Sequence, residues 1–195
     1  MIRKPKILLM AFVVVALLFG AVTPQSTRAS DKVIDFTLRD LQGHEVSLSQ
    51  YRGHPVVIDF WATWCAPCRH QIPELKKLYT KYHKSKGLEV LGISCDTVQG
   101  EGLKVIRPFV REFDINYPIL LAEPPVLDSF GVEALPTTLF LSPDGSIAGR
   151  MLGSGGVGEL TEGVNSLLAG KSKSAKKLTP TEQKKENRYD IEYRQ

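Results

Sequence analysis

Residues 56–68 read Val-Val-Ile-Asp-Phe-Trp-Ala-Thr-Trp-Cys-Ala-Pro-Cys. The first part of this stretch, with the preceding proline, is rich in β-branched and aromatic residues, which is typical of a strand buried inside a sheet. Apolar residues at helical spacing follow over 67–86. The stretch therefore predicts a buried strand that leads into a helix, with Cys65 and Cys68 at the junction.

A pair of thiols at the start of a helix suits one kind of chemistry. The free amides and the dipole of a helix N-terminus favour an anion, so we expect Cys65 to be a nucleophilic thiolate. Cys68 lies nearly one turn further on the same side, and Pro67 in the first turn limits the flexibility of the pair. We expect Cys65 to attack a target disulfide and Cys68 to resolve the resulting mixed disulfide.

The same thiols could serve other purposes. A structural zinc site needs four ligands, whereas Cys95 is the one further thiol and the four histidines show no paired ligand spacing. A structural disulfide across so small a loop would constrain the chain little. A copper chaperone, with Cys95 helping to hold Cu(I), stays an alternative. A thiol peroxidase is a further one, although no lone cysteine has a threonine three residues before it. We expect no cofactor and no resident metal.

Two residues outside the pair strengthen the redox interpretation. Asp59 lies in the apolar strand, where burial should raise the pKa of its carboxyl, so it is a candidate proton acceptor for Cys68. The alternative is an aspartate at a strand edge that faces solvent. Pro136 precedes a predicted strand, and a cis bond there would expose a backbone edge to an extended substrate. Spacing alone favours an ordinary trans proline.

The order of elements indicates an α/β fold with a mixed parallel and antiparallel sheet and helices on both faces. A turn at 42–43 joins two strands in an N-terminal hairpin, and Pro143-Asp144-Gly145 joins two more. The predicted strands cover 35–39, 44–47, 55–61, 88–94, 117–121, 137–141 and 146–151. The predicted helices cover 67–86, 105–113, 126–130 and 157–168.

The N-terminus has the features of an export signal. Three basic residues precede an apolar run over 7–22, and a polar stretch follows. Small residues favour cleavage after Ala29, yet the run is almost long enough to span a bilayer. We therefore expect residues 1–29 to be a signal peptide or a membrane anchor. Either places the domain outside the cytoplasm, in a periplasm or its equivalent, because the basic flank stays inside.

Charge separates the rest of the chain into two parts. Residues 30–170 suit one domain, and 31–170 hold 13 basic and 17 acidic side chains, which argues against a nucleic-acid-binding protein. Residues 171–195 hold eight basic and four acidic side chains and almost no aliphatic ones. This composition predicts a disordered basic tail, with contact to anionic lipid as an alternative.

The quoted stretch resembles the active-site strand and motif of the thioredoxin superfamily. Pro73 matches the family's helix-kinking proline, and Leu135-Pro136-Thr137-Thr138 matches its cis-proline element. The resemblance covers about 34–170. It implies a thioredoxin-like fold, a proton-transfer role for Asp59 and a cis bond before Pro136. The residues that it implies for substrate contact are Trp64, Ala66, Pro67, Leu135 and Pro136.

More narrowly, the chain is similar to the exported TlpA/ResA branch. The support is the export segment, the N-terminal hairpin, the extra segment between 95 and 125, and PTTLFLSPDGSI at 136–147. The resemblance implies a reductase of disulfides in exported proteins, cytochrome c precursors among them, with a membrane thiol carrier as electron donor.

Two features depart from that branch. Asp59 stands where the branch usually has Asn, and Asp96 lies one residue before the place where it often carries a functional Glu. Cys95, next to Asp96, has three interpretations: a small buried apolar side chain, a secondary redox thiol or a copper ligand.

Overall fold

The computed structural model describes residues 35–100, 102–155 and 158–171. The expected signal peptide or anchor at 1–29 and nearly all of the expected tail lie outside these residues. Within them, no helix is both long enough and apolar enough to cross a membrane.

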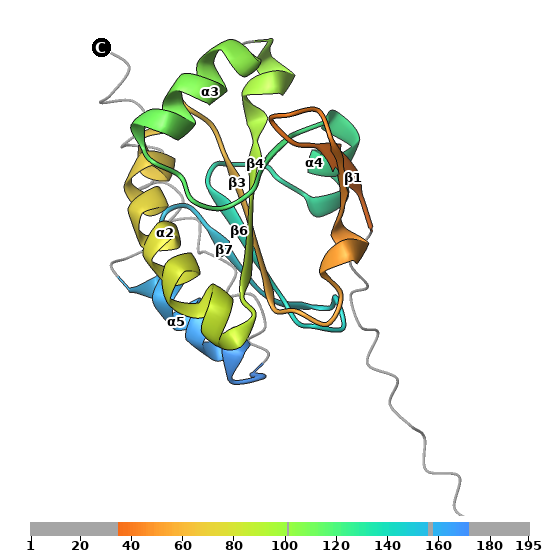
Figure 1. The fold of residues 1–195 in the computed structure, drawn as a ribbon, viewed down its shortest axis with the longest axis vertical. Helices are drawn as coiled ribbons and strands as arrows, with labels where there is room; N and C mark the ends of the chain where they lie inside the picture. Colours follow the sequence, from red (N-terminus) through yellow and green to blue (C-terminus); the bar gives the residue numbers. More distant parts are fainter. Residues whose placement is uncertain (1–34, 101, 156–157, 172–195) are drawn as a thin grey trace, which may run out of the picture. The chain divides into compact units, whose positions relative to one another are not determined.

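A five-stranded mixed sheet forms the centre of the fold, in the order β5-β4-β3-β6-β7 (Figure 1). The central strand β3 runs parallel to β4, which in turn runs parallel to β5, whereas β6 is antiparallel to both β3 and β7. The strands are β3 (Val56–Trp61), β4 (Glu89–Ser94), β5 (Ile119–Leu121), β6 (Thr137–Leu141) and β7 (Ile147–Leu152).

Every residue of β3 is buried, as its sequence of apolar residues around a single aspartate predicts. Successive side chains of a strand point to opposite faces, so Asp59 and Trp61 share one face and Phe60 lies on the other. The register places Asp59 beside Gly92 of β4 and Thr138 of β6. The single charged residue of the strand therefore sits in the middle of the sheet.

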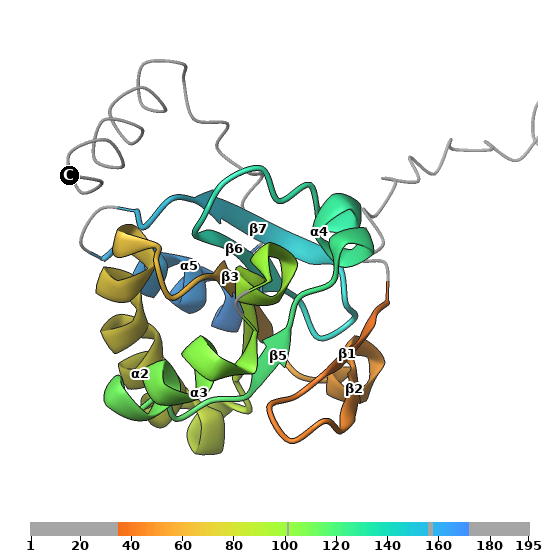
Figure 2. The ribbon, with the colours of Figure 1, turned by 90° about the horizontal axis from the view of Figure 1, so that it is seen from above.

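Helices cover both faces of the sheet, as expected. Figure 2 shows α2, α3 and α5 on one side and α4 with the β1–β2 hairpin on the other. Ring contacts agree with this division, because Trp61 packs on Phe109 of α3 and Phe60 on Phe130 of α4. The helices are α2 (Ala66–Lys86), α3 (Leu103–Glu112), α4 (Pro124–Phe130) and α5 (Glu159–Leu168).

The N-terminal hairpin pairs β1 (Thr37–Arg39) with β2 (Glu45–Ser47) in antiparallel fashion. The Asp40 carboxylate orders the turn, since it accepts hydrogen bonds from the amides of Gln42 and His44 at 2.8 Å each. Asp40 also forms an isolated antiparallel bridge with Leu120 of β5. The hairpin thus meets the edge strand of the main sheet, which limits the exposure of that edge.

The predicted elements are all present, with shifted ends. Helix α4 begins at Pro124 rather than 126, since proline is tolerated in a first helical turn, and α3 begins at Leu103 rather than 105. Two 3-10 helices, η1 (Leu48–Tyr51) and η2 (Cys95–Gln99), are not among the predicted elements, because helices this short have no periodic sequence pattern.

Candidate active site

Cys65 and Cys68 form a disulfide at the start of α2, with their Cα atoms 5.3 Å apart. Cys65 caps the helix: its sulfur accepts a hydrogen bond from the amide of Cys68 at 3.2 Å. Cys68 is fully buried, whereas Cys65 keeps 4% of its surface exposed. A helix N-terminus favours negative charge, so the geometry suits a thiolate on Cys65, the sulfur nearer to solvent.

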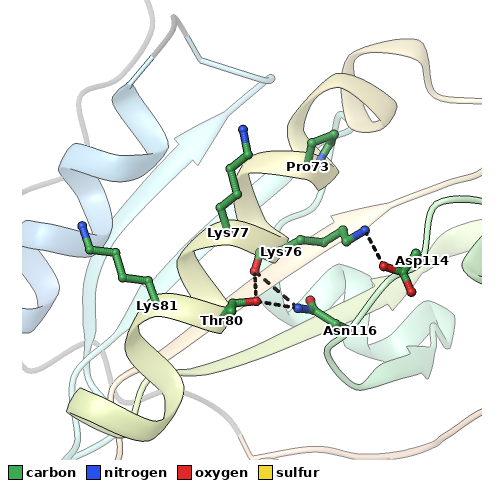
Figure 3. A pocket seen from close by; sticks show the side chains of 7 residues that line it. All are labelled: Pro73, Lys76, Lys77, Thr80, Lys81, Asp114 and Asn116. Carbon is green, nitrogen blue, oxygen red and sulfur yellow. Dashed lines mark hydrogen bonds and ion pairs between the residues drawn. The ribbon is translucent and has the colours of Figure 1, made fainter.

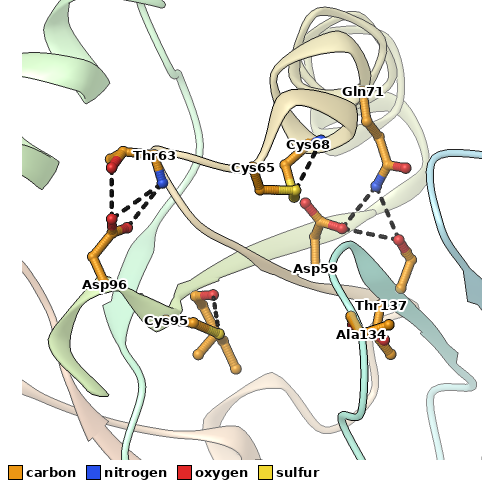
Figure 4. The surroundings of a disulfide bond; sticks show 11 residues. Asp59, Thr63, Cys65, Cys68, Gln71, Cys95, Asp96, Ala134 and Thr137 are labelled. Carbon is orange, nitrogen blue, oxygen red and sulfur yellow. Dashed lines mark hydrogen bonds between the residues drawn. A yellow bond between two sulfur atoms is a disulfide. The ribbon is translucent and has the colours of Figure 1, made fainter. Parts of the chain in front are cut away.

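Asp59 lies beneath the pair, and Figure 4 shows its carboxyl pointing toward the disulfide. The side chain is wholly buried. Burial raises the pKa of this carboxyl to about 7, although hydrogen bonds from Thr138 and Gln71 lower it. The alternative of a solvent-facing edge aspartate is therefore wrong. A buried carboxyl that titrates near neutrality can accept or return a proton under ordinary conditions.

Gln71 and Thr138 complete this buried group, and neither is among the site residues predicted from the sequence. Gln71 Nε2 donates to Asp59 Oδ1 at 2.7 Å and to Thr138 Oγ1 at 3.0 Å. Thr138 Oγ1 donates to the same Asp59 oxygen at 2.9 Å. One signal was available, because Gln71 lies three residues after Cys68 and so shares its buried helix face.

The Leu135–Pro136 peptide bond is cis, as the family resemblance implied and as spacing alone did not. Pro136 is buried and directly precedes β6, whose Thr137 pairs with Phe60 near the carboxyl end of β3. The proline loop and the disulfide therefore lie at the same end of the sheet. The carbonyl of Pro136 accepts a hydrogen bond from the amide of Gly153, which connects the proline loop to the residue that follows β7.

Three of the other residues expected to contact substrate, Trp64, Ala66 and Pro67, lie next to Cys65 in the sequence, and Leu135 directly precedes the cis proline. Trp64 is 49% exposed, which makes it one of two large apolar side chains at the surface of the described residues. Ala66, Pro67 and Leu135 are half-buried. The structure thus gives the disulfide an accessible apolar rim, and the contacts with substrate stay a prediction.

Asp96 is buried and holds the loop that leads into the disulfide. Its carboxylate accepts hydrogen bonds from the amide and the hydroxyl of Thr63 and from the hydroxyl of Ser94. These bonds join the end of β4 to the residue two positions before Cys65. Asp96 is therefore placed to shape the site, although it is separate from the Asp59 group.

Cys95 is a buried free thiol. Burial, followed by the charges of Asp96 and Asp59, raises the pKa of this thiol to about 12. A thiol that stays protonated is a poor nucleophile and a poor metal ligand, which favours the interpretation as a small apolar side chain. No group of three His, Cys, Asp or Glu side chains suited to a metal ion occurs among the described residues.

A surface pocket of about 480 Å³ lies along the outer side of α2 (Figure 3). Four of its polar side chains bond in pairs: Lys76 Nζ contacts Asp114 at 3.2 Å, and Asn116 donates to Thr80 Oγ1 at 2.8 Å. None of its residues belongs to the disulfide or the Asp59 group. The lining residues are Pro73, Lys76, Lys77, Thr80, Lys81, Asp114 and Asn116.

The architecture and the Cys-x-x-Cys disulfide together define a protein of thioredoxin-like fold. A family model described as the AhpC/TSA family matches residues 29–150, and the chain belongs to that family. It is similar to the thiol-disulfide oxidoreductase ResA of Geobacillus kaustophilus, with 38% identity over 114 residues. This match covers 58% of this chain and 63% of the relative. The ResA of Bacillus subtilis is 32% identical over 121 residues, 62% of this chain and 65% of that relative.

Solved structures give the same result for the fold. The thioredoxin domain of a thiol-disulfide oxidoreductase from Bacteroides vulgatus superposes with a TM-score of 0.60 and 25% identity, over 71% of this chain and 96% of that one. The expected fold class and the resemblance to ResA are thereby confirmed. The chain spans less than two thirds of the length of the curated relatives that it matches.

Proposed function

We propose that this protein is a thiol–disulfide oxidoreductase that works mainly as a reductase of protein disulfides. The observation that carries the proposal is the disulfide at the N-terminus of α2, directly above a buried carboxyl whose pKa is near 7. Neither a structural disulfide nor a metal site needs a proton acceptor in that place. The names of the ResA relatives and the Ala-Pro pair between the cysteines support the same activity.

In the first step the Cys65 thiolate attacks one sulfur of the target disulfide. A bond forms between Cys65 and that sulfur, the target disulfide breaks, and the second target sulfur leaves as a thiolate. The amide of Cys68 and the helix dipole stabilise the attacking anion. The exposed Trp64 and the cis-proline loop provide the surface against which an extended target lies.

In the second step Cys68 closes the cycle. Its thiol gives a proton to the Asp59 carboxylate, and the new thiolate attacks the Cys65 sulfur. The Cys65–Cys68 disulfide forms, the first target sulfur leaves as a thiolate, and the target has gained two electrons. An external dithiol then reduces the Cys65–Cys68 pair and makes the enzyme ready for another turnover.

The proposed setting is extracytoplasmic, in a periplasm or its equivalent. The basic residues and apolar run at the N-terminus support export, with residues 7–22 as the means of attachment if they are not removed. The proposed targets are disulfides of exported proteins, cytochrome c precursors among them, and the proposed electron donor is a membrane thiol carrier. Both follow from the resemblance to the ResA branch.

The test is reduction of insulin in the presence of dithiothreitol, with three matched cysteine variants. Cys65→Ser should abolish turnover, and Cys68→Ser should accumulate a mixed disulfide that mass spectrometry detects. Cys95→Ser is the control and should keep wild-type turnover. Normal turnover by either of the first two variants would contradict the proposed cycle.

Two further assays address the alternative functions. Tight stoichiometric binding of Cu(I) under anaerobic conditions, with negligible insulin reduction, would replace the proposal with a copper chaperone. Rapid consumption of hydrogen peroxide without disulfide reduction would replace it with a thiol peroxidase.

A further inference from the structure

The two oxygens of the Asp59 carboxyl have different surroundings. Oδ1 accepts two hydrogen bonds, one from Gln71 Nε2 and one from Thr138 Oγ1. Oδ2 is buried and has no hydrogen-bond partner among the residues that the structure describes. In Figure 4 the oxygen bonded to Gln71 lies on the side away from the sulfurs, and the other oxygen lies on the side of the disulfide.

This asymmetry decides where a proton can sit. The donors that face Oδ1 are an amide N–H and a hydroxyl, and each stabilises negative charge on that oxygen. A proton placed on Oδ1 would oppose both donors, whereas Oδ2 can accept one without losing a bond. The neutral form of Asp59 is therefore protonated on Oδ2.

The two donors come from distant parts of the chain and also bond each other. Gln71 is on α2, three residues after Cys68, and Thr138 is on β6, two residues after the cis proline. The second N–H of the Gln71 amide donates to Thr138 Oγ1, which directs the hydroxyl hydrogen toward Asp59. The orientation of the carboxyl is thus fixed from the helix side and from the strand side at once.

We propose that Gln71 and Thr138 are positioning residues that hold Oδ1 of Asp59, so that Oδ2 alone exchanges a proton with Cys68. This inference rests on the proposed function, because it assigns the groups that control its proton-transfer step. Gln71 and Thr138 do not touch the target. They act through Asp59 by fixing its geometry and its affinity for the proton.

Among the buried groups around the disulfide, Asp59 is the one whose pKa is near neutrality in the oxidised protein. Cys95, near the end of β4, has a pKa raised to about 12, and burial raises the pKa of Tyr117 well above its usual value. The pair above it, Cys65 and Cys68, carries no ionisable thiol while it is oxidised. The charged or titratable residues of α2 closest to Cys68 in sequence, Arg69 and His70, are exposed.

The test measures the titration of Asp59 directly, without relying on turnover. Oxidised protein labelled with 13C at the aspartate carboxyl carbons is titrated by NMR, with Asp59→Asn to assign the signal. Gln71→Met and Thr138→Val each remove one donor at nearly constant volume. We expect either change to raise the midpoint by about one pH unit, because the charged form loses a hydrogen bond. Thr138→Ser keeps the hydroxyl and should keep the wild-type midpoint.

The same variants are then assayed for insulin reduction between pH 6 and 9. The pH at which the rate of mixed-disulfide resolution is half-maximal should rise with the NMR midpoint, a change that a merely structural role would not produce. Unchanged midpoints in Gln71→Met and Thr138→Val, with wild-type thermal stability, would overturn the inference. Raised midpoints in a protein whose wild type fails to reduce insulin would leave the Asp59 group as described and reject the proposed function instead.

Discussion

Asp96 and Thr63 are joined by three hydrogen bonds across 33 residues of sequence. The amide of Thr63 donates to both carboxylate oxygens, at 3.2 and 3.0 Å, and its hydroxyl donates to Oδ1 at 2.6 Å. Asp96 is fully buried, and Ser94 supplies a further donor at 2.7 Å. The loop that places Cys65 is therefore attached to the end of β4 as well as to β3.

The first prediction concerns this attachment. Asp96→Asn puts an amide nitrogen where a carboxylate oxygen accepts from Thr63, so at least one buried donor loses its acceptor. We expect a loss of about 1–3 kcal/mol in the free energy of unfolding, measured in urea. We also expect insulin reduction to slow about tenfold, because a loosened loop misplaces the attacking sulfur. Asp128→Asn, at an exposed position of α4, is the control and should change neither quantity.

The second prediction concerns Cys95, whose thiol has a pKa of about 12. In the oxidised native protein at pH 8, iodoacetamide should label no cysteine within minutes, and in urea it should label Cys95 rapidly. Mass spectrometry of tryptic peptides distinguishes the two states. Fast labelling of the native protein would show an accessible thiolate and would restore Cys95 as a candidate redox thiol.

The third prediction concerns Gly163, in the interior of α5. Glycine to alanine normally stabilises a helix interior by about 1 kcal/mol. Here an added Cβ would lie 2.4 Å from the ring of Phe140 on β6, so the packed ring must move. We expect Gly163→Ala to destabilise the protein by about 1–3 kcal/mol in thermal or urea unfolding. Ser166→Ala on the same helix provides the contrast and should be neutral or slightly stabilising.

The sequence predicted the elements and the two cysteines because those signals are local. The run at 56–61, the Cys-x-x-Cys spacing and the Pro-Asp-Gly turn each lie within a few consecutive residues. The partners of Asp59 and Asp96 were missed, since they depend on which distant segments the fold brings together. Gln71 and Thr138 are 67 residues apart, and without the register of β3 with β6 no pattern joins them. The cis proline is intermediate: spacing favoured trans, and only the family resemblance indicated cis.

The fourth prediction concerns the contribution of Asp59 to the stability of the protein as pH changes. The pKa of its carboxyl is near its usual value in the unfolded chain and about 7 in the folded protein. The folded state therefore holds this proton more tightly, and the corresponding stability is complete below about pH 4 and is lost as pH rises through 7. A difference of about three pH units corresponds to about 4 kcal/mol.

Asp59→Asn removes this dependence, because the amide stays neutral and keeps an oxygen for Gln71 and Thr138. We expect the oxidised variant to exceed the wild type by about 2–4 kcal/mol in urea unfolding at pH 8, and to match it near pH 4. Other carboxylates titrate in both proteins, so the difference between them isolates Asp59. A constant difference across this range would mean that Asp59 is ionised throughout. In that case the pKa of its carboxyl would be near the usual value, the carboxylate would be too weak a base to take a proton from the Cys68 thiol, and the proton-transfer role of Asp59 would be rejected.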